Sequence, residues 1–164
     1  MSGPSPRMRR VIGRAMRAPA VFDRPGLRWL LGAFSPAPIV VLVHRGRRSG
    51  RIYSTPVEAI AGDPEQGEVV VSPLWGERSD WYRNVLAGGL VEAHVRGDSR
   101  QLEWRQLSEE ERREALSAYR REHPLYSRAI LRILARVHGL AGDPAEAVTR
   151  ALPMLGLRRP PSDR

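Results

Sequence analysis

Four arginines, two glycines and a serine are concentrated in the segment R-G-R-R-S-G-R, residues 45–51. Guanidinium groups form strong charge-assisted bonds with phosphates and carboxylates, and glycine lets the backbone turn so that N–H groups face an anion. The predicted anion-binding residues are Arg47, Arg48, Ser49, Gly50 and Arg51. The alternative is a solvated turn whose arginines only keep the protein in solution.

A second segment, W-G-E-R-S-D-W-Y-R-N-V at residues 75–85, combines aromatic rings with an amide. Trp81 and Asn84 lie three residues apart and therefore share one face of a helix. That face would place a flat apolar ring beside a group that both donates and accepts hydrogen bonds, which suits a heteroaromatic ligand. The alternative is a core tryptophan followed by an asparagine at a helix end.

Several common catalytic sites are excluded by composition and spacing. The chain contains no cysteine and no lysine, so it has no thiolate metal site, no cysteine nucleophile and no Schiff base. The four histidines are scattered over different predicted elements, and no metal site is predicted. The sequence also lacks a G-x-S-x-G elbow, a P-loop lysine motif and a G-x-G-x-x-G dinucleotide motif.

The positive charge is uneven along the 164 residues, whose net charge is +9. Residues 1–51 contain eleven arginines and one acid, whereas residues 52–164 contain sixteen arginines and seventeen acids. This distribution does not indicate a uniformly basic nucleic-acid-binding protein. It leaves a local basic surface that could contact a small anion or an anionic membrane.

Short apolar and β-branched runs separated by turn residues predict an antiparallel β structure. The predicted strands cover residues 38–44, 51–60, 68–72, 90–96 and 101–107, with a further strand at 152–157. The first two form a hairpin around the arginine-rich turn, and R-G-D-S at residues 96–99 is predicted as another turn. This pattern favours a small closed barrel over a parallel α/β sheet.

Helical periodicity marks both ends of the chain. Residues 7–18 predict a basic amphipathic helix, followed by a shorter one at 26–34; both either pack on the main domain or rest on a membrane surface. Further helices are predicted after Ser108, whose pairing with Glu111 is a capping box, at residues 125–137, and from Asp143 onward. We expect three parts in the chain: a helical segment at residues 1–37, a coenzyme-binding domain at 38–157 and a loose tail at 158–164.

No segment is long and apolar enough to predict a membrane span, and the first residues do not resemble a signal peptide. We therefore expect a cytoplasmic protein, with peripheral contact at the inner membrane face as the alternative.

Two segments in this order resemble the deazaflavin-dependent nitroreductase family, split β-barrel proteins that bind the 8-hydroxy-5-deazaflavin coenzyme F420. They are V-L-V-H-R-G-R-R-S-G-R-I-Y-S-T-P-V, residues 41–57, and G-E-R-S-D-W-Y-R-N-V-L-A-G-G, residues 76–89. The resemblance covers about residues 38–107. It implies an α+β fold, a split β-barrel of about six mostly antiparallel strands with flanking helices.

The resemblance also implies roles for the residues singled out above. The basic hairpin would hold the coenzyme's phosphate and polyglutamate tail, Trp81 and Asn84 would line the deazaflavin ring, and the segment from Ser72 would pass along the same ring. Two positions depart from the family: Tyr53 stands where many members have arginine, and Trp75 narrows the expected pocket.

The function implied is an F420-dependent reductase that transfers hydride to a quinone, enone or nitro acceptor. The proton donor would be Tyr126, Tyr82, His123 or solvent, and Tyr126 is the catalytic residue we predict. Two alternatives stay open at this point. One is an FMN-binding split-barrel reductase, because an arginine cradle also accepts a phosphate, and the other is a non-enzymatic module that binds coenzyme or a membrane surface.

Overall fold

A computed structural model describes residues 35–62, 67–95 and 98–160 of the chain. The helices predicted at residues 7–18 and 26–34 lie outside this part. Within the described ranges, no helix has the length and apolar character that a membrane crossing requires.

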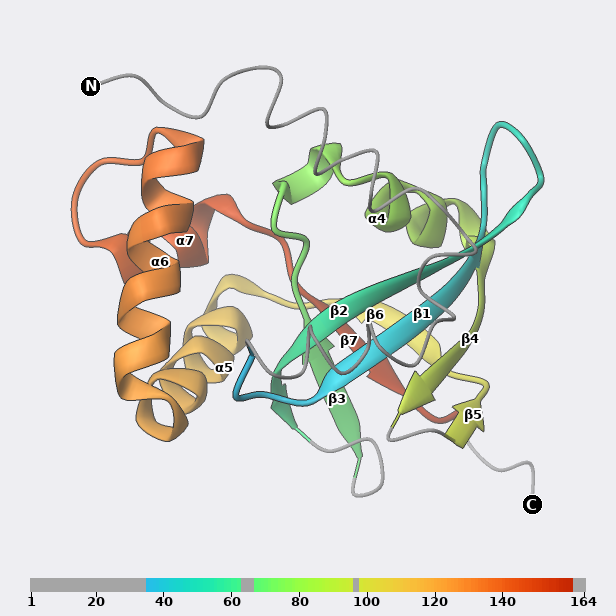
Figure 1. Ribbon diagram of the computed structural model, residues 1–164, viewed down its shortest axis with the longest axis horizontal. Helices are drawn as coiled ribbons and strands as arrows, with labels where there is room; N and C mark the ends of the chain where they lie inside the picture. Colours follow the sequence, from blue (N-terminus) through green and yellow to red (C-terminus); the bar gives the residue numbers. More distant parts are fainter. Residues whose placement is uncertain (1–34, 63–66, 96–97, 161–164) are drawn as a thin grey trace.

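Seven strands form one antiparallel sheet in the order β5-β4-β1-β2-β3-β7-β6 (Figure 1). The strands are β1 (Ile39–Arg45), β2 (Ile52–Gly62), β3 (Glu68–Val71), β4 (Leu90–Val95), β5 (Asp98–Arg100), β6 (Glu103–Gln106) and β7 (Leu155–Arg158). The predicted hairpin is confirmed, because β1 and β2 pair from Ile39 with Glu58 to Arg45 with Ile52.

The sheet curls because its two edge strands follow each other in the sequence. Strand β5 ends at Arg100 and β6 begins at Glu103, yet they occupy opposite edges. A linker of this length spans only about 10 Å, so the edges approach each other and the sheet forms a half-barrel. Leu102, in the linker, is buried in the barrel core. The α+β split-barrel prediction is therefore confirmed, with seven strands rather than about six.

One local prediction was wrong for the residues that the structure describes. Of the R-G-D-S segment, which was expected to be a turn, residues 96–97 lie outside the described part, and Asp98 and Ser99 belong to the edge strand β5, which pairs with β4 from Ala93 opposite Arg100 to Val95 opposite Asp98. Polar residues are tolerated there because an edge strand has one neighbour and faces solvent on its other side.

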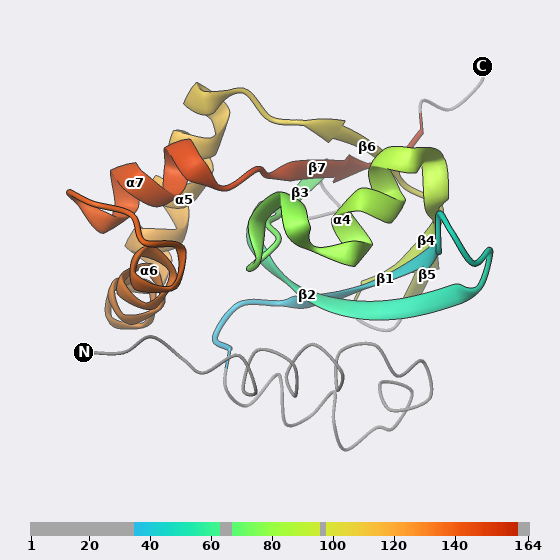
Figure 2. The same cartoon turned by 90° about the horizontal axis from the view of Figure 1, so that it is seen from above.

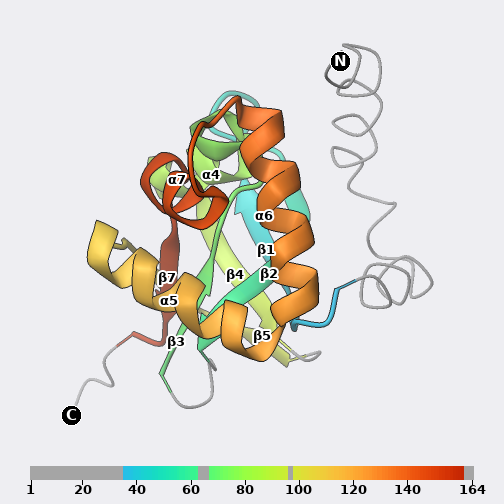
Figure 3. The ribbon, with the colours of Figure 1, turned by 90° about the vertical axis from the view of Figure 1, so that its left-hand side faces the viewer.

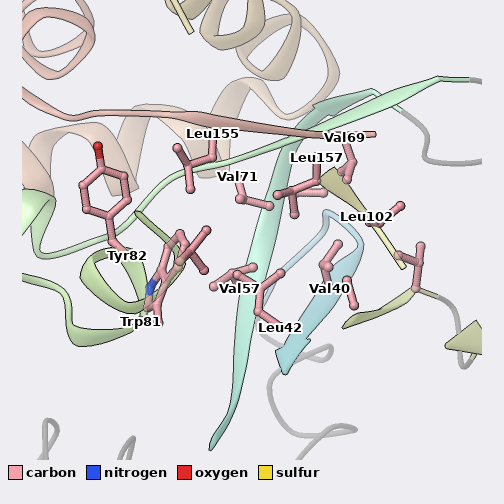
Figure 4. Packing of buried hydrophobic residues seen from close by; sticks show 14 residues of the cluster. Val40, Leu42, Val57, Val69, Val71, Trp81, Tyr82, Leu102, Leu155 and Leu157 are labelled. Atoms are coloured by element: carbon pink, nitrogen blue, oxygen red, sulfur yellow. The ribbon is translucent and has the colours of Figure 1, made fainter. Parts of the chain in front are cut away.

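Alternation along β1 determines the inside of the barrel. Val40 and Leu42 are fully buried, whereas Ile39, Val41 and Val43 are half-buried, as expected for a strand whose side chains point to alternate faces. Helix α4 (Asp80–Asn84) fills the open side of the half-barrel, where Trp81 and Tyr82 join the inward residues of β1 and β7 (Figures 2 and 4).

The remaining helices lie together at one end of the sheet (Figures 1 and 3). They are α5 (Glu109–Glu122), α6 (Pro124–His138) and α7 (Pro144–Ala151). Two short helical segments, η1 (Gly76–Arg78) and η2 (Val85–Gly89), lie instead on either side of α4 in the sequence. The Ser108 capping box is confirmed, as is the start of α7 at Asp143, whose side chain accepts bonds from two amides. A second apolar core, including Leu116, Val148 and Met154, fills the space between these helices and the sheet.

Candidate functional site

The arginine-rich turn is a tight loop between β1 and β2. The amide of Gly46 donates to the carbonyl of Arg51 at 2.7 Å, and the amide of Gly50 donates to that of Gly46 at 2.8 Å. Gly50 has φ +66°, a conformation that favours glycine. The amides of Arg48 and Ser49 have no acceptor among the described residues. The tip of the turn therefore offers two adjacent N–H groups beside the exposed side chain of Arg48.

Arg47 extends from the turn to α4. Its Nη1 donates to Asn84 Oδ1 at 2.9 Å and lies 3.4 Å from Asp80 Oδ1, and its backbone amide also donates to Asn84 Oδ1, at 3.1 Å. The turn is thus fixed to α4 through one arginine, while Arg48 and Arg51 stay exposed.

A buried polar chain continues from Asn84 into the barrel. Asn84 Nδ2 donates to His44 Nδ1 at 3.2 Å, so His44 Nε2 carries the proton and donates to Thr55 Oγ1 at 3.0 Å. Burial lowers the pKa of His44 from 6.5 to about 4, against a smaller opposing effect of the Asp80 charge. His44 is therefore neutral at physiological pH, and it acts as a fixed hydrogen-bonding spacer between Asn84 and Thr55.

A cavity of about 310 Å³ lies beside these hydrogen-bonded side chains, since Thr55 lines it. Its volume is at the lower end of the range for small-molecule sites. Its walls come from the outer part of β2, the segment from Ser72 to Trp81, and helices α5, α6 and α7. The lining residues are Thr55, Pro56, Val57, Glu58, Ile60, Ser72, Leu74, Trp75, Arg78, Ser79, Asp80, Trp81, Leu116, Tyr119, Ile130, Leu131, Leu134, Val148, Leu152 and Met154. Asp80 of its wall contacts Arg47 of the arginine-rich turn, and the lining residues contributed by the three helices are apolar except for Tyr119.

Polar groups are sparse on the cavity wall, and one has no partner. Ser79 is buried and its Oγ forms no hydrogen bond within the described part of the chain. Ser72 Oγ donates to the carbonyl of Pro153 at 3.0 Å and retains its acceptor capacity. Because a buried hydroxyl without a partner is unfavourable, Ser79 marks a position where a ligand atom would complete the site.

A carboxylate held by two phenols faces the apolar part of the cavity. The hydroxyl of Tyr119 donates to Glu58 Oε1, and the hydroxyl of Tyr126 donates to Glu58 Oε2 at 3.2 Å. Burial raises the pKa of both tyrosines, and the Glu58 carboxylate raises it further. Both phenols therefore keep their protons at neutral pH. Tyr119 lines the cavity, and its proton lies in the hydrogen bond to Glu58.

The chain matches one protein-family model over most of its length. The model of the family described as F420H(2)-dependent quinone reductase matches residues 26–133, which is more than half of the chain. The chain belongs to this family. The family is one of enzymes, its reductant is F420H2 and its acceptors are quinone-type molecules, so the FMN-binding and non-enzymatic alternatives are set aside.

The chain was also compared with curated proteins and with solved structures. No curated protein matches the chain. One solved structure, described as a domain-swapped dimer, shares 18% identity over 85% of this chain and 99% of its own, with a TM-score of 0.45.

For this quinone reductase family member, the structure brings some of the predicted site residues together and separates others. Ser72 and Trp81 line the cavity, and Trp81 is also part of the barrel core, with 8% of its surface exposed. Asn84, 4% exposed, does not line the cavity, because its amide is bonded to Arg47 and His44. Tyr126 is also absent from the cavity wall and reaches it only through Glu58.

The residues that the sequence reading missed are Glu58, Tyr119, Ser79 and His44. A signal existed for Glu58, an acid between Pro56 and Ile60 on one face of a β-branched strand, and for Tyr119, which continues the apolar stripe of Ala115 and Leu116. Neither signal could show that these side chains meet. Among residues 35–62, 67–95 and 98–160, no group of acids and histidines could hold a metal ion.

Proposed function

We propose that the cavity holds the ring of F420H2 together with the ring of a quinone, and that the arginine-rich turn holds the acidic tail of the coenzyme. The observation that carries this proposal is Asp80, which lines the cavity and also contacts Arg47 of the turn. The anion-binding turn and the apolar cavity therefore adjoin, as a ligand with a charged tail and a flat apolar ring requires.

The residues at the turn fit the acidic part of the coenzyme. Arg48 and Arg51 are exposed cations, and the amides of Arg48 and Ser49 are free to donate. In this proposal Arg48 and Ser49 contact the phosphate, Gly50 permits the turn and Arg51 contacts the tail. Arg47 and Asn84 act as positioning residues that hold the turn against α4.

The cavity wall fits a flat redox molecule. Trp81 and Trp75 provide aromatic surface, and Ser72 and Ser79 offer hydroxyl groups to ring carbonyls or nitrogens. Ser79 is the stronger of the two candidates, because its hydroxyl has no other partner in the described ranges. The apolar helices exclude water, which prevents loss of the reductant to side reactions.

When bound, F420H2 supplies a hydride, and the quinone becomes a hydroquinone by gaining that hydride and a proton. We assign the proton to the Tyr119 hydroxyl, which lies on the cavity wall and would turn its proton from Glu58 to the quinone oxygen for the transfer. Glu58 Oε1 accepts the Tyr119 hydrogen bond and orients the phenol, and Tyr126 holds the other carboxylate oxygen. Solvent returns a proton to Tyr119 after each turnover. Enone and nitro acceptors need the same two components and fit the same apolar space.

Titration of the protein with F420, read by fluorescence quenching, tests the turn. Loss of one charge-assisted contact costs about 1.5–3 kcal/mol, so Arg48→Ala is expected to raise the dissociation constant by about 10- to 100-fold. The matched control is Arg159→Ala, which replaces an exposed arginine directly after β7. This variant should leave the dissociation constant unchanged. Equal dissociation constants for the wild type and Arg48→Ala would contradict the assignment of the turn.

A further inference from the structure

Helix α6 exposes a face on which arginines alternate with apolar residues. Within it, Leu125, Ala129 and Ile133 follow one another at intervals of four, and so do Arg128, Arg132 and Arg136. All six are exposed. Since residues three and four apart are neighbours on a helix surface, they form one continuous stripe, which we call the outer face of α6.

The outer face is not a leftover part of the protein core. The opposite side of α6 already packs inward through Ser127, Leu131 and Ala135, and Ile130 and Leu134 line the cavity. Leu125 is nevertheless 82% exposed and Ile133 55% exposed, the two highest values among the large apolar residues of the described chain. Folding of the monomer therefore leaves most of Leu125 and about half of Ile133 in contact with water.

The charge of the outer face has one sign. No acid lies on it, and none of Arg128, Arg132 and Arg136 forms an ion pair with another described residue. On the preceding helix, by contrast, Arg113 pairs with Glu109 at 2.8 Å. An exposed helix that serves only solubility normally mixes charges of both signs in this way.

We propose that the outer face of α6 docks on the surface of an anionic lipid bilayer. Leu125 and Ile133 would enter the boundary between headgroups and acyl chains, and the three arginines would reach the lipid phosphates with their aliphatic stems along the interface. Interfacial helices combine these two residue types on one face, and each arginine near an anionic surface adds to the affinity.

The N-terminal segment of the chain is a poor alternative occupant of this face. Residues 1–34 contain seven arginines and a single acid, so they carry the same sign of charge as the outer face and would be repelled by it. Both would be attracted to an anionic membrane.

The outer face and the cavity lie on different sides of α6. Ile130 and Leu134, which line the cavity, are on the side of the helix away from Ala129 and Ile133. A bilayer on the outer face would therefore not cover the cavity.

Co-sedimentation of the full chain with vesicles tests the proposal without coenzyme, so its outcome is independent of the proposed function. We expect binding to vesicles of equal parts phosphatidylglycerol and phosphatidylcholine, and weaker binding to phosphatidylcholine alone. Substituting Arg128→Gln, Arg132→Gln and Arg136→Gln together should weaken binding to the anionic vesicles, by about fivefold per arginine and on the order of 100-fold in total. Leu125→Ser with Ile133→Ser should weaken it by about tenfold.

The control variant removes the same charge elsewhere, with Arg113→Gln, Arg158→Gln and Arg159→Gln, all exposed and outside α6. It should weaken binding by less than about threefold, since these side chains do not face the bilayer. An equal effect of the two triple variants would overturn the proposal. So would an arginine effect without any effect of the apolar pair, which would assign the outer face to a soluble polyanion instead of a membrane.

Discussion

At the scale of single residues, the most informative group is the carboxylate of Glu58 between two phenols. A carboxylate in a largely apolar wall is unfavourable unless its oxygens are bonded, and Tyr119 and Tyr126 each satisfy one of them. The two phenols are not equivalent, because only Tyr119 lines the cavity. We therefore propose Tyr119 as the proton donor, whereas the sequence favoured Tyr126.

Replacing Tyr119 by phenylalanine tests this assignment. A positioned general acid contributes roughly 100-fold or more to a rate, so Tyr119→Phe is expected to lower kcat for menadione reduction by about that factor while leaving coenzyme affinity unchanged. Steady-state kinetics with F420H2 and a solvent isotope effect on kcat provide the measurement. Tyr126→Phe is the matched control, with a smaller expected loss; an equal or larger loss would return the role of proton donor to Tyr126.

His44 gives a prediction about stability and pH. The unfolded chain takes up a proton on this side chain near pH 6.5, whereas the folded chain keeps it neutral down to about pH 4. The unfolded state therefore binds more protons below pH 6.5. The free energy of unfolding should fall as the pH is lowered from 6.5 toward 4, by about 2 kcal/mol at pH 5 and about 3 kcal/mol in total.

Urea unfolding of the wild type and of His44→Gln at pH 7.5 and pH 5 checks this contribution. The variant lacks the titrating group, so the difference in unfolding free energy between the two proteins should shrink at pH 5 relative to pH 7.5. A difference that is the same at both pH values would show that His44 is not held neutral in the folded state.

At the scale of elements, the junction of α4 with the hairpin holds the site together. The η2 turn returns the chain to the barrel at Gly89, where an added Cβ would lie 2.6 Å from the carbonyl oxygens of both Arg45 and Asn84. Only glycine permits this approach. Because Arg45 precedes the arginine-rich turn and Asn84 binds Arg47, a displacement here would be transmitted to the proposed coenzyme site.

Gly89→Ala should therefore change both stability and binding. Overpacking of a tight site costs about 1–3 kcal/mol, which urea unfolding would measure, and the F420 dissociation constant should rise as the turn loses its support. The matched control is Gly67→Ala, where an added Cβ meets nothing within 4 Å and neither quantity should change. Identical behaviour of the two variants would exclude a role for the close approach at Gly89.

Local sequence signals were sufficient for most elements but not for the site. The hairpin, the Ser108 capping box and the start of α7 at Asp143 were predicted correctly, since each depends on residues close together in the chain. Strand β5 was missed because its polar residues resemble a turn and only pairing with β4 makes them a strand. The cavity could not be predicted, because its walls come from β2 and from three helices more than 50 residues later.

At the scale of the whole molecule, the sheet and the helices enclose two separate apolar cores. The inner core fills the half-barrel, and the outer core lies between the sheet and α5, α6 and α7. The cavity contacts both, through Trp81 of the inner core and Leu116 of the outer core. The functional site thus depends on closure of the barrel as well as on the attachment of the helices.

Leu102 tests how far the half-barrel depends on the approach of its two edge strands. This side chain sits in the link between β5 and β6, is 8% exposed, and packs in the inner core (Figure 4). Leu102→Ala should lower the free energy of unfolding by about 2–5 kcal/mol, from lost burial and the space left behind. Leu125→Ala removes the same atoms from an exposed position and should cost less than about 0.5 kcal/mol.

Urea unfolding followed by both tryptophan fluorescence and circular dichroism should show one shared transition in each variant. Separate transitions for the two probes would mean that the barrel and the helical end unfold independently, and a loss for Leu102→Ala no larger than that for Leu125→Ala would mean that the link does not hold the sheet in its curled form.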